Sequence, residues 1–358
     1  MHPSIGKQRR PHFGTGVNSY RHTHSRLSTC ASKLCLCPAN PYNGLLINTH
    51  NVIVSKAYKP SRVTLPLQSS CKSVLSFLVD TFPHVSESEW MSRMAEGKVY
   101  WENRVKVPVD ADYQAGRVLY YHREVEQEPT IPFAEMIIEH NEHFLIAYKP
   151  HFLPVMPGGV FVNECLQQRL IDKTGNPNLQ AVHRLDRDTA GLVMFSTNPH
   201  TRSDYHQLFA QQNIKKHYQA IAKTQAGESL SGKSWHIKNY LARSEPQFIF
   251  QNLDTSPDDT SPHDKDAQYA ESLIHCEDDN LQLGLFTLSP ITGRTHQLRL
   301  HMMSLGFPIL NDRFYPSLQP KQADNFSQPL QLLAHKLSFI DPVSKEPRAF
   351  TSPVQLEI

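Results

Sequence analysis

The distribution of acidic residues separates a segment that lacks the means to fold from the rest of the chain. No Asp or Glu occurs before Asp80, whereas residues 1–79 contain ten Lys and Arg. Residues 1–65 also lack a sustained hydrophobic period and are rich in Ser, Thr, Asn, Pro and His. Low hydrophobic density with one sign of charge is typical of a disordered segment. A folded core is therefore expected in the remainder of the 358 residues.

Three interpretations of residues 1–65 stay open. The segment could be a basic arm that binds nucleic-acid phosphates, or an organellar transit peptide, since such peptides are rich in Arg and Ser and poor in acids. We favour a third interpretation, upstream sequence included through a wrong start site, and expect the segment to be dispensable. Its cysteines and histidines lack the paired spacing of a zinc module, so no metal site is expected at Cys30, Cys35, Cys37, His22 and His24.

The composition of the other 279 residues excludes several classes of protein. They hold 26 basic and 34 acidic residues, so this part is not a generically basic nucleic-acid binder and needs a local basic cleft for any polyanion. No apolar run approaches the ~18 residues of a membrane span. Six cysteines are too few for a disulfide scaffold, which favours a reducing compartment and a cytoplasmic location.

Residues 66–125 have the pattern of a small α/β domain. The segment SVLSFLVDTFP (73–83) has apolar residues near a period of 3.6 and predicts a helix. Ser86 and Glu89 form the S-x-x-E signature of a second helix, which Gly97 can end. The segment KVYWENRVKV (98–107) then predicts a short hairpin, and RVLYY predicts a closing strand.

A linker containing Pro129 and Pro132 leads to a larger domain, expected over residues 130–358. Segments rich in β-branched and aromatic residues predict strands, and segments whose apolar residues recur with a helical period predict helices. The expected strands are 142–150, 191–197, 216–223, 281–289 and 335–341, and the expected helices are 204–212 and 295–306. Residues 252–267 are acidic and rich in Ser and Pro, and are expected to form an exposed loop.

The segment HRLDRDTAGLVMFS (183–196) carries the strongest chemical signal. Asp186 lies among His183, Arg184 and Arg187, directly before small residues and an apolar strand. A carboxylate beside arginines stays ionised at neutral pH, which suits a nucleophile or a base better than a general acid. From the residues alone, a structural Asp–Arg pair that ties a loop to a strand is the favoured explanation of the pattern.

Five ordered segments resemble the motifs of the RluA family of RNA pseudouridine synthases. HRLDRDTAGLVMF resembles the family's central H-R-L-D-x-x-T-[SA]-G-L motif, and the other segments are 147–159, 215–222, 289–315 and 332–342. The resemblance implies an α+β fold, a mixed, mainly antiparallel sheet around a central catalytic cleft. In residues 66–125, the helix-Gly-x-Val…Asn-x-x-Val pattern resembles an S4 RNA-binding domain, but its helices carry few bases, so a docking module is the alternative.

The resemblance also implies an activity and a set of site residues. The family isomerises uridine in RNA to pseudouridine without a metal or cofactor, after flipping the base out of its helix. The matching catalytic positions are Asp186 as nucleophile, Tyr218 and Arg299, with Arg299 expected to form a bidentate ion pair with Asp186. Arg184 matches the arginine that fills the space of the flipped base. We expect substrate contacts from Arg184, His183, Arg294 and Lys215.

Several points stay open in this reading. The substrate is expected to be ribosomal RNA or possibly tRNA, and the protein is expected to be a monomer. A non-catalytic RNA-binding or ribosome-assembly factor that kept the fold is the alternative, and a metal-dependent nuclease would need more clustered carboxylates. Whether Asp186 attacks C1′, adds to C6 or removes a proton from C2′ is not decided. Asn311 stands where the family usually has Gly, so the turn there could differ.

Overall fold

The computed structural model of this protein describes residues 46–47, 53–224, 229–245, 249–253 and 266–358. The segment with His22, His24, Cys30, Cys35 and Cys37, where no metal site is expected, and most of the acidic loop 252–267 lie outside these ranges. No helix within the described ranges has the length and apolar character that a bilayer crossing requires.

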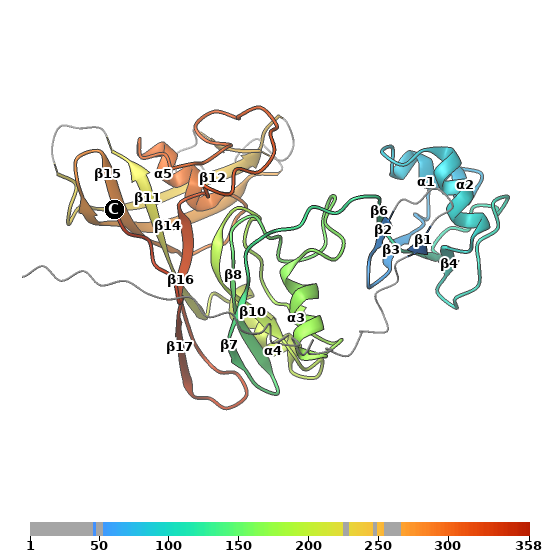
Figure 1. Cartoon of the computed structure of the whole chain (residues 1–358), viewed down its shortest axis with the longest axis horizontal. Coiled ribbons are helices and arrows are strands. Elements are labelled where there is room, and N and C mark those ends of the chain that lie inside the picture. The colour runs from blue at the N-terminus through green and yellow to red at the C-terminus, as the bar shows by residue number, and fades with distance from the viewer. Residues whose placement is uncertain (1–45, 48–52, 225–228, 246–248, 254–265) are drawn as a thin grey trace, which may run out of the picture. The chain divides into compact units, whose positions relative to one another are not determined.

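The small domain packs two helices on one face of a three-stranded sheet (Figure 1). The helices are α1 (Val74–Thr81) and α2 (Glu87–Ala95), and the sheet has the order β3 (Ser61–Thr64), β5 (Val118–Tyr121), β4 (Val99–Trp101). Side chains alternate along a strand, so one face of each strand enters the core between sheet and helices, where Trp90, Leu119 and Trp101 are buried. The helices and the closing strand predicted here are confirmed.

Local sequence signals set the ends of these helices. Ser73 caps α1 by accepting a hydrogen bond from the Ser76 N–H, and the Ser86 hydroxyl accepts from the Glu89 N–H at the start of α2. Gly97 follows α2 with φ of +72°, a left-handed conformation that glycine adopts without a Cβ penalty. The Glu89 side chain instead binds Arg93, so only half of the predicted capping box forms.

The boundary expected at residue 66 is wrong. Strand β3 pairs antiparallel with β5, so residues 61–64 belong to the small domain. A separate three-stranded sheet has the order β1 (Leu46–Ile47), β2 (Ile53–Lys56), β6 (Glu124–Val125). Of the four residues of β3, only Val63 is apolar, and composition therefore hid this edge strand in the polar segment.

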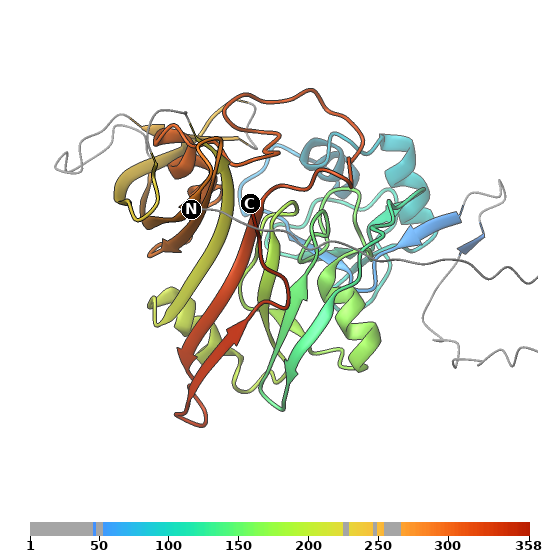
Figure 2. The ribbon, with the colours of Figure 1, turned by 60° about the vertical axis from the view of Figure 1, so that its left-hand side comes forward.

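Over its described residues, the large domain is built on one mixed sheet of eleven strands, which confirms the expected fold class. Figure 2 shows several of the long strands side by side. The main path of this sheet is β13 (Phe250–Leu253), β12 (Ser234–Arg243), β14 (Gln268–Asp279), β15 (Leu283–Pro290), β11 (Ile214–Lys223), β16 (Leu332–Ile340), β10 (Ala190–Ser196), β8 (Phe144–Lys149) and β7 (Met136–His140). Strand β17 (Pro347–Thr351) pairs with β16, and β9 (Gln180–Ala181) pairs with β10. All pairs are antiparallel except β10 with β16.

Helices cover both faces of the sheet around β8 and β10. Helix α3 (Leu166–Thr174) shares a core with Leu145 and Ala147 of β8, and α4 (Arg202–Ala210) shares another with Phe144 and Ile146. Because neighbouring residues of a strand point to opposite faces, α3 and α4 lie on opposite sides of the sheet. A strand buried on both faces reads as a continuous apolar run, as β8 and β10 do.

The parallel contact of β10 with β16 places the candidate site. Gly191 lies against Ala334 with φ of +119°, and a Cβ at this position would lie 2.3 Å from the Ala334 carbonyl oxygen. Only glycine lets the two strands approach this closely. The loop that ends at β10 is therefore held beside β16 and β11, on the side where α5 (Gln297–Ser304) begins.

Candidate active site

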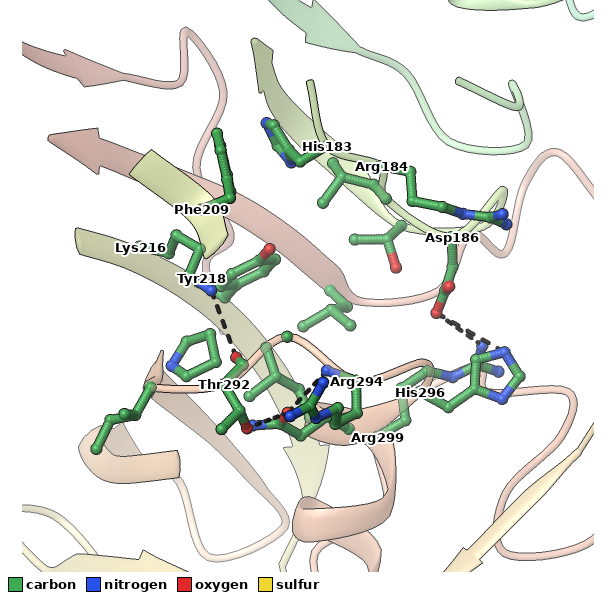
Figure 3. Close-up of a pocket in the computed structure, with 18 of the residues that line it drawn as sticks. His183, Arg184, Asp186, Phe209, Lys216, Tyr218, Thr292, Arg294, His296 and Arg299 are labelled. Carbon is green, nitrogen blue, oxygen red and sulfur yellow. Dashed lines mark hydrogen bonds and ion pairs between the residues drawn. The ribbon is translucent and has the colours of Figure 1, made fainter. Parts of the chain in front are cut away.

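A cavity of about 450 Å³ lies between the loop before β10, strand β11 and the segment that leads into α5 (Figure 3). The cavity is lined by polar and charged side chains and by apolar ones that include Leu298 and Leu332. The polar lining residues are His183, Arg184, Asp186, Thr189, Gln212, Lys216, Tyr218, Thr292, Arg294, His296, Gln297 and Arg299. The cavity thus brings together all the predicted site residues except Lys215.

The side chain of Lys149 holds the loop that carries Asp186. This fully buried lysine donates hydrogen bonds of 2.9, 2.7 and 2.9 Å to the carbonyls of Pro150, Leu153 and Arg187. Three acceptors match the three N–H donors of an ammonium group. Burial lowers the pKa of Lys149 to about 7, while the charges of Asp188 and Asp186 oppose this shift. Lys149 therefore orients the backbone directly after Asp186.

A network of ion pairs joins the same loop to the segment after α5. Arg187 makes two hydrogen bonds of 2.8 and 2.7 Å with Asp324, and Arg313 contacts both Asp188, at 3.2 Å, and Asp324. Asp188 is buried, and the guanidinium groups of Arg187 and Arg313, both within about 4 Å, balance its negative charge. These contacts leave Asp186 as the carboxylate of this loop that faces the cavity.

Arg299 lies beside Asp186, but its bidentate partner is a different residue. Its Nε and Nη2 donate to the two carboxylate oxygens of Asp312 at 2.7 and 2.5 Å, whereas Nη1 lies 3.6 Å from Oδ2 of Asp186. The expected ion pair between Arg299 and Asp186 is therefore present, but its expected bidentate geometry is wrong. Arg299 is 2% exposed, and a guanidinium this deeply buried needs a buried counter-charge, which Asp312 supplies at 1% exposure.

His296 is the second basic side chain next to Asp186. It precedes α5 with φ of +56°, and its Nε2 lies 3.8 Å from Oδ2 of Asp186. Its Nδ1 lies 2.9 Å from the hydroxyl of Tyr315, which accepts a hydrogen bond from the Phe250 N–H. In the tautomer in which the Tyr315 hydroxyl donates its own proton to Nδ1, Nε2 carries the ring proton and directs it toward Asp186. Burial lowers the pKa of His296 and favours this neutral form.

Tyr218 projects from β11 into the cavity (Figure 3). Burial and the negative charge of Asp186 raise the pKa of its phenol well above the ordinary value, so the group stays protonated at neutral pH. A protonated phenol can donate a hydrogen bond or present its ring face, but it cannot act as a phenolate base. Tyr218 thus lines the same cavity as Asp186.

The residues expected to contact substrate do not all line the cavity. Arg184 and Arg294 line the cavity with exposed side chains, although Arg294 also donates to the Tyr269 carbonyl at 2.9 Å. Lys215 does not line the cavity; it borders a different hollow next to β17. Side chains alternate along β11, so the lysine on the same face as Tyr218 is Lys216, which corrects the expectation for Lys215.

His183 lines the cavity as a neutral residue held by the fold. Its Nε2 accepts a hydrogen bond of 2.9 Å from the Met194 N–H, and its ring stacks on Phe209 with centroids 4.4 Å apart. Burial lowers its pKa to about 3, and the charge of Lys216 contributes to the same direction. These two contacts of His183 fix the conformation of the loop just before Asp186.

The roles of Asp312 and Lys149 and the orientation of His296 were not predicted from the sequence. Asp312 ends the sequence ILND (309–312), which lies in the segment 289–315 that resembles the family. The resemblance therefore offered a signal for Asp312. Asn311 has φ of +63° and its amide donates to the Pro329 carbonyl, which shows how asparagine replaces glycine in this turn. Among the residues that the structure describes, no group of three His, Cys, Asp or Glu side chains is arranged to hold a metal ion.

Known proteins with similar sequences point to one family. Residues 143–304 match the model of the RNA pseudouridylate synthase family. The chain is 30% identical over 227 residues to the dual-specificity RNA pseudouridine synthase RluA of Pasteurella multocida, an alignment that covers 63% of this chain and 95% of that protein. It is 32% identical over 226 residues to the RluA protein of Vibrio vulnificus, covering 63% and 85% of the two chains.

Among solved structures, human RNA pseudouridylate synthase domain containing 1 is similar with a TM-score of 0.48 and 20% sequence identity, over 64% of this chain and 86% of that one. The two sequence relatives are covered over 95% and 85% of their lengths, and the segment that matches the family model contains Asp186, Tyr218 and Arg299. This chain therefore belongs to the RluA family of RNA pseudouridine synthases and is an isomerase that acts on RNA.

Proposed function

We propose that the cavity around Asp186 isomerises uridines of ribosomal RNA, with tRNA as a second substrate, by side-chain chemistry alone. The observation that carries the proposal is the pairing of two carboxylates with one arginine. Asp312 binds Arg299 in two hydrogen bonds, so Arg299 can face Asp186 without neutralising it through a close contact. Asp186 thus keeps a free carboxylate edge that points into the cavity.

The reaction must balance within this one cavity. The bond between N1 of uracil and C1′ of the ribose breaks, a bond between C5 and C1′ forms, C5 loses its proton and N1 gains one. An ionised Asp186 serves each of the routes that start at C1′, C6 or C2′. Arg299 stays charged, since Asp312 and Asp186 raise its pKa against the effect of burial, and it holds the carboxylate rather than exchanging a proton.

The aromatic and cationic side chains around Asp186 suit a flipped base. Extruding a base from a helix costs a few kcal/mol. Tyr218 offers an aromatic face inside the cavity, and stacking of a base on such a ring is worth about 1–3 kcal/mol. Arg184 lies exposed at the rim, two residues before Asp186, where a long cation can occupy the space left in the helix.

The names of the relatives and the presence of the small domain both bear on which RNA is the substrate. The two relatives above are named dual-specificity enzymes, and a related protein of Buchnera aphidicola is named ribosomal large subunit pseudouridine synthase C. A separate two-helix, three-stranded domain before the catalytic domain favours a large structured RNA. We therefore place ribosomal RNA first and tRNA second.

Release of tritium from C5-labelled uridine tests the proposal directly, because the C5 proton is lost only when C5 bonds to C1′. Unmodified ribosomal RNA and tRNA transcripts are compared as substrates for the full chain. Asp186→Asn should release less than about a tenth of the wild-type tritium, while RNA binding changes only a few-fold. Asp204→Asn, at an exposed position in α4, is the matched control and should act as wild type.

Mapping pseudouridines in total RNA from a strain that lacks the gene identifies the target. Loss of a site in ribosomal RNA alone supports the first choice, and loss in tRNA alone overturns it. Activity of Asp186→Asn above a tenth of wild type would remove Asp186 from the reaction.

A further inference from the structure

One row of side chains crosses the open face of the small-domain sheet. The register pairs Arg62 of β3 with Tyr120 of β5, Tyr120 with Tyr100 of β4, and Tyr100 with Lys106 in the following segment. The order across the sheet is therefore cation, tyrosine, tyrosine, cation. At ~4.8 Å between strands, the row spans roughly 14 Å.

The row lies on the face opposite the helices. Core residues between sheet and helices include Leu119, Trp101 and Val99, which alternate along the strands with Tyr120 and Tyr100. Both tyrosines keep part of their surface exposed, and the flanking Arg62 and Lys106 are exposed. This face is consequently not needed to fill the core.

The two rings form a short aromatic column. Their centroids are 5.9 Å apart and their planes differ by 11°, a stacked arrangement. A cross-strand aromatic pair stabilises a sheet by about 0.2–1 kcal/mol, which explains the pair but not the cations at both ends of it. A nucleobase that continues the column at either end would lie beside one of these cations.

The described residues show which cations of the small domain are engaged by carboxylates. Ion pairs occupy Arg93, Lys98 and Arg117. Within the described ranges, no such pair involves Arg62, Lys106 or the exposed Arg104 that lies near Tyr100. Exposed cations around a stack of aromatic rings are complementary to a single strand of RNA, whose bases stack while its phosphates bind the charges.

We infer that Arg62, Tyr120, Tyr100 and Lys106 form a platform that binds single-stranded RNA. The inference rests on the proposed RNA substrate and deepens it, because it assigns an RNA contact to the sheet of the small domain. The acidic residues Glu87 and Glu89 at the start of α2 make the helix side a poorer phosphate surface. A single-stranded loop or end of the substrate is the part that fits.

The test titrates a fluorescent, about 12-nucleotide single-stranded RNA of mixed sequence with the full chain. Tyr100→Leu combined with Tyr120→Leu should raise Kd about tenfold or more, because ring stacking is lost. Tyr100→Phe with Tyr120→Phe keeps the rings and is the matched control; its Kd should stay within about twofold of wild type. Circular dichroism and thermal unfolding check that each variant folds.

A second pair of variants tests the charges and does not depend on the leucine variants folding. Arg62→Gln with Lys106→Gln should make the log–log salt dependence of binding shallower by about 1.4, or 0.7 for each phosphate contact on a single strand. Lys72→Gln, an exposed lysine directly before the N-terminus of α1, is the control and should leave the slope unchanged.

Unchanged Kd in the folded leucine variant and an unchanged slope in the glutamine variant would overturn the platform. A slope that falls only in Lys72→Gln would move the RNA to the helix side. The titration requires no turnover, so it judges the platform even if the protein released no tritium from any transcript, the result that would refute the proposed function instead.

Discussion

Arg299 is bound by Asp312 through two hydrogen bonds of 2.7 and 2.5 Å, and only its third nitrogen approaches Asp186, at 3.6 Å. The guanidinium also packs against the ring of Phe314, 4.7 Å from its centroid. Asp312 therefore fixes the plane of the arginine, and the arginine in turn limits where Asp186 can lie. Asp312 is a positioning residue, and Asp186 keeps the carboxylate that faces substrate.

The two carboxylates should respond differently to neutralisation. Asp312→Asn leaves a buried guanidinium without its bidentate counter-charge, so unfolding free energy should fall by about 3–5 kcal/mol. Asp186→Asn leaves the Asp312 pair intact, so stability should stay within about 1 kcal/mol of wild type while activity is lost. Urea unfolding and tritium release of both variants measure this separation.

Arg299→Met extends the same experiment. It should lose both stability and activity, whereas Arg294→Met, at an exposed arginine of the same cavity, should lose little stability. If Asp186→Asn were destabilised as strongly as Asp312→Asn, the two carboxylates would share the arginine equally and the assignment of Asp312 would be wrong.

Substitutions at Tyr218 separate the ring from the hydroxyl. Tyr218→Phe keeps a surface on which uracil can stack, so its tritium-release rate should fall less than that of Tyr218→Leu. Loss of one base–aromatic stack costs about 1–3 kcal/mol, which predicts roughly a tenfold lower kcat/KM for the leucine variant than for the phenylalanine variant. Equal activity of the two variants would refute stacking on Tyr218.

The fold was largely predictable from hydrophobic pattern, and the exceptions have physical reasons. The apolar runs of β8 and β10 predicted buried strands because both of their faces lie under helices. Strand β3 escaped detection because it is a short edge strand with alternating polar residues. Strands β12 and β14 were not predicted either; several of their side chains are exposed, which weakens the apolar signal.

The catalytic positions were predictable only through the family resemblance, since one sequence does not show which charges pair. Periodicity could have distinguished Lys216 from Lys215, because the former shares a strand face with Tyr218. Only the fold, which brings α5 and the following turn together, shows that the bidentate partner of Arg299 is Asp312 rather than Asp186. The S4 resemblance, a monomeric state and a cytoplasmic location stay predictions.

The lysines of β11 provide a matched pair for locating the RNA. Lys216 lines the cavity, and its Nζ lies 3.4 Å from the Thr292 carbonyl, whereas Lys215 is exposed on the other face of the strand. Lys216→Gln should make the salt dependence of substrate binding shallower by about 0.7–0.9, as one lost phosphate contact does. Lys215→Gln should not change it, and the opposite ranking would place the RNA on the other side of the sheet.

His183 links the shape of the active-site loop to pH. In the folded protein its Nε2 must keep a lone pair to accept the Met194 N–H, and burial lowers its pKa to about 3 from an ordinary value of 6.5. The unfolded chain therefore binds one more proton than the folded chain between these values. Stability conferred by a neutral His183 is present above pH 6.5 and is lost as the pH falls toward 3.

Urea unfolding at pH 7 and pH 5 measures this contribution. With an unfolded pKa of 6.5, the unfolded state gains about 2 kcal/mol from protonating His183 at pH 5, so wild type should lose about that much more stability between the two pH values than His183→Gln does. The glutamine variant cannot titrate, and its amide oxygen can still accept from Met194. His206→Gln, at an exposed position of α4, is the control and should keep the wild-type pH dependence. Equal losses in wild type and His183→Gln would show that His183 is not held neutral by the fold.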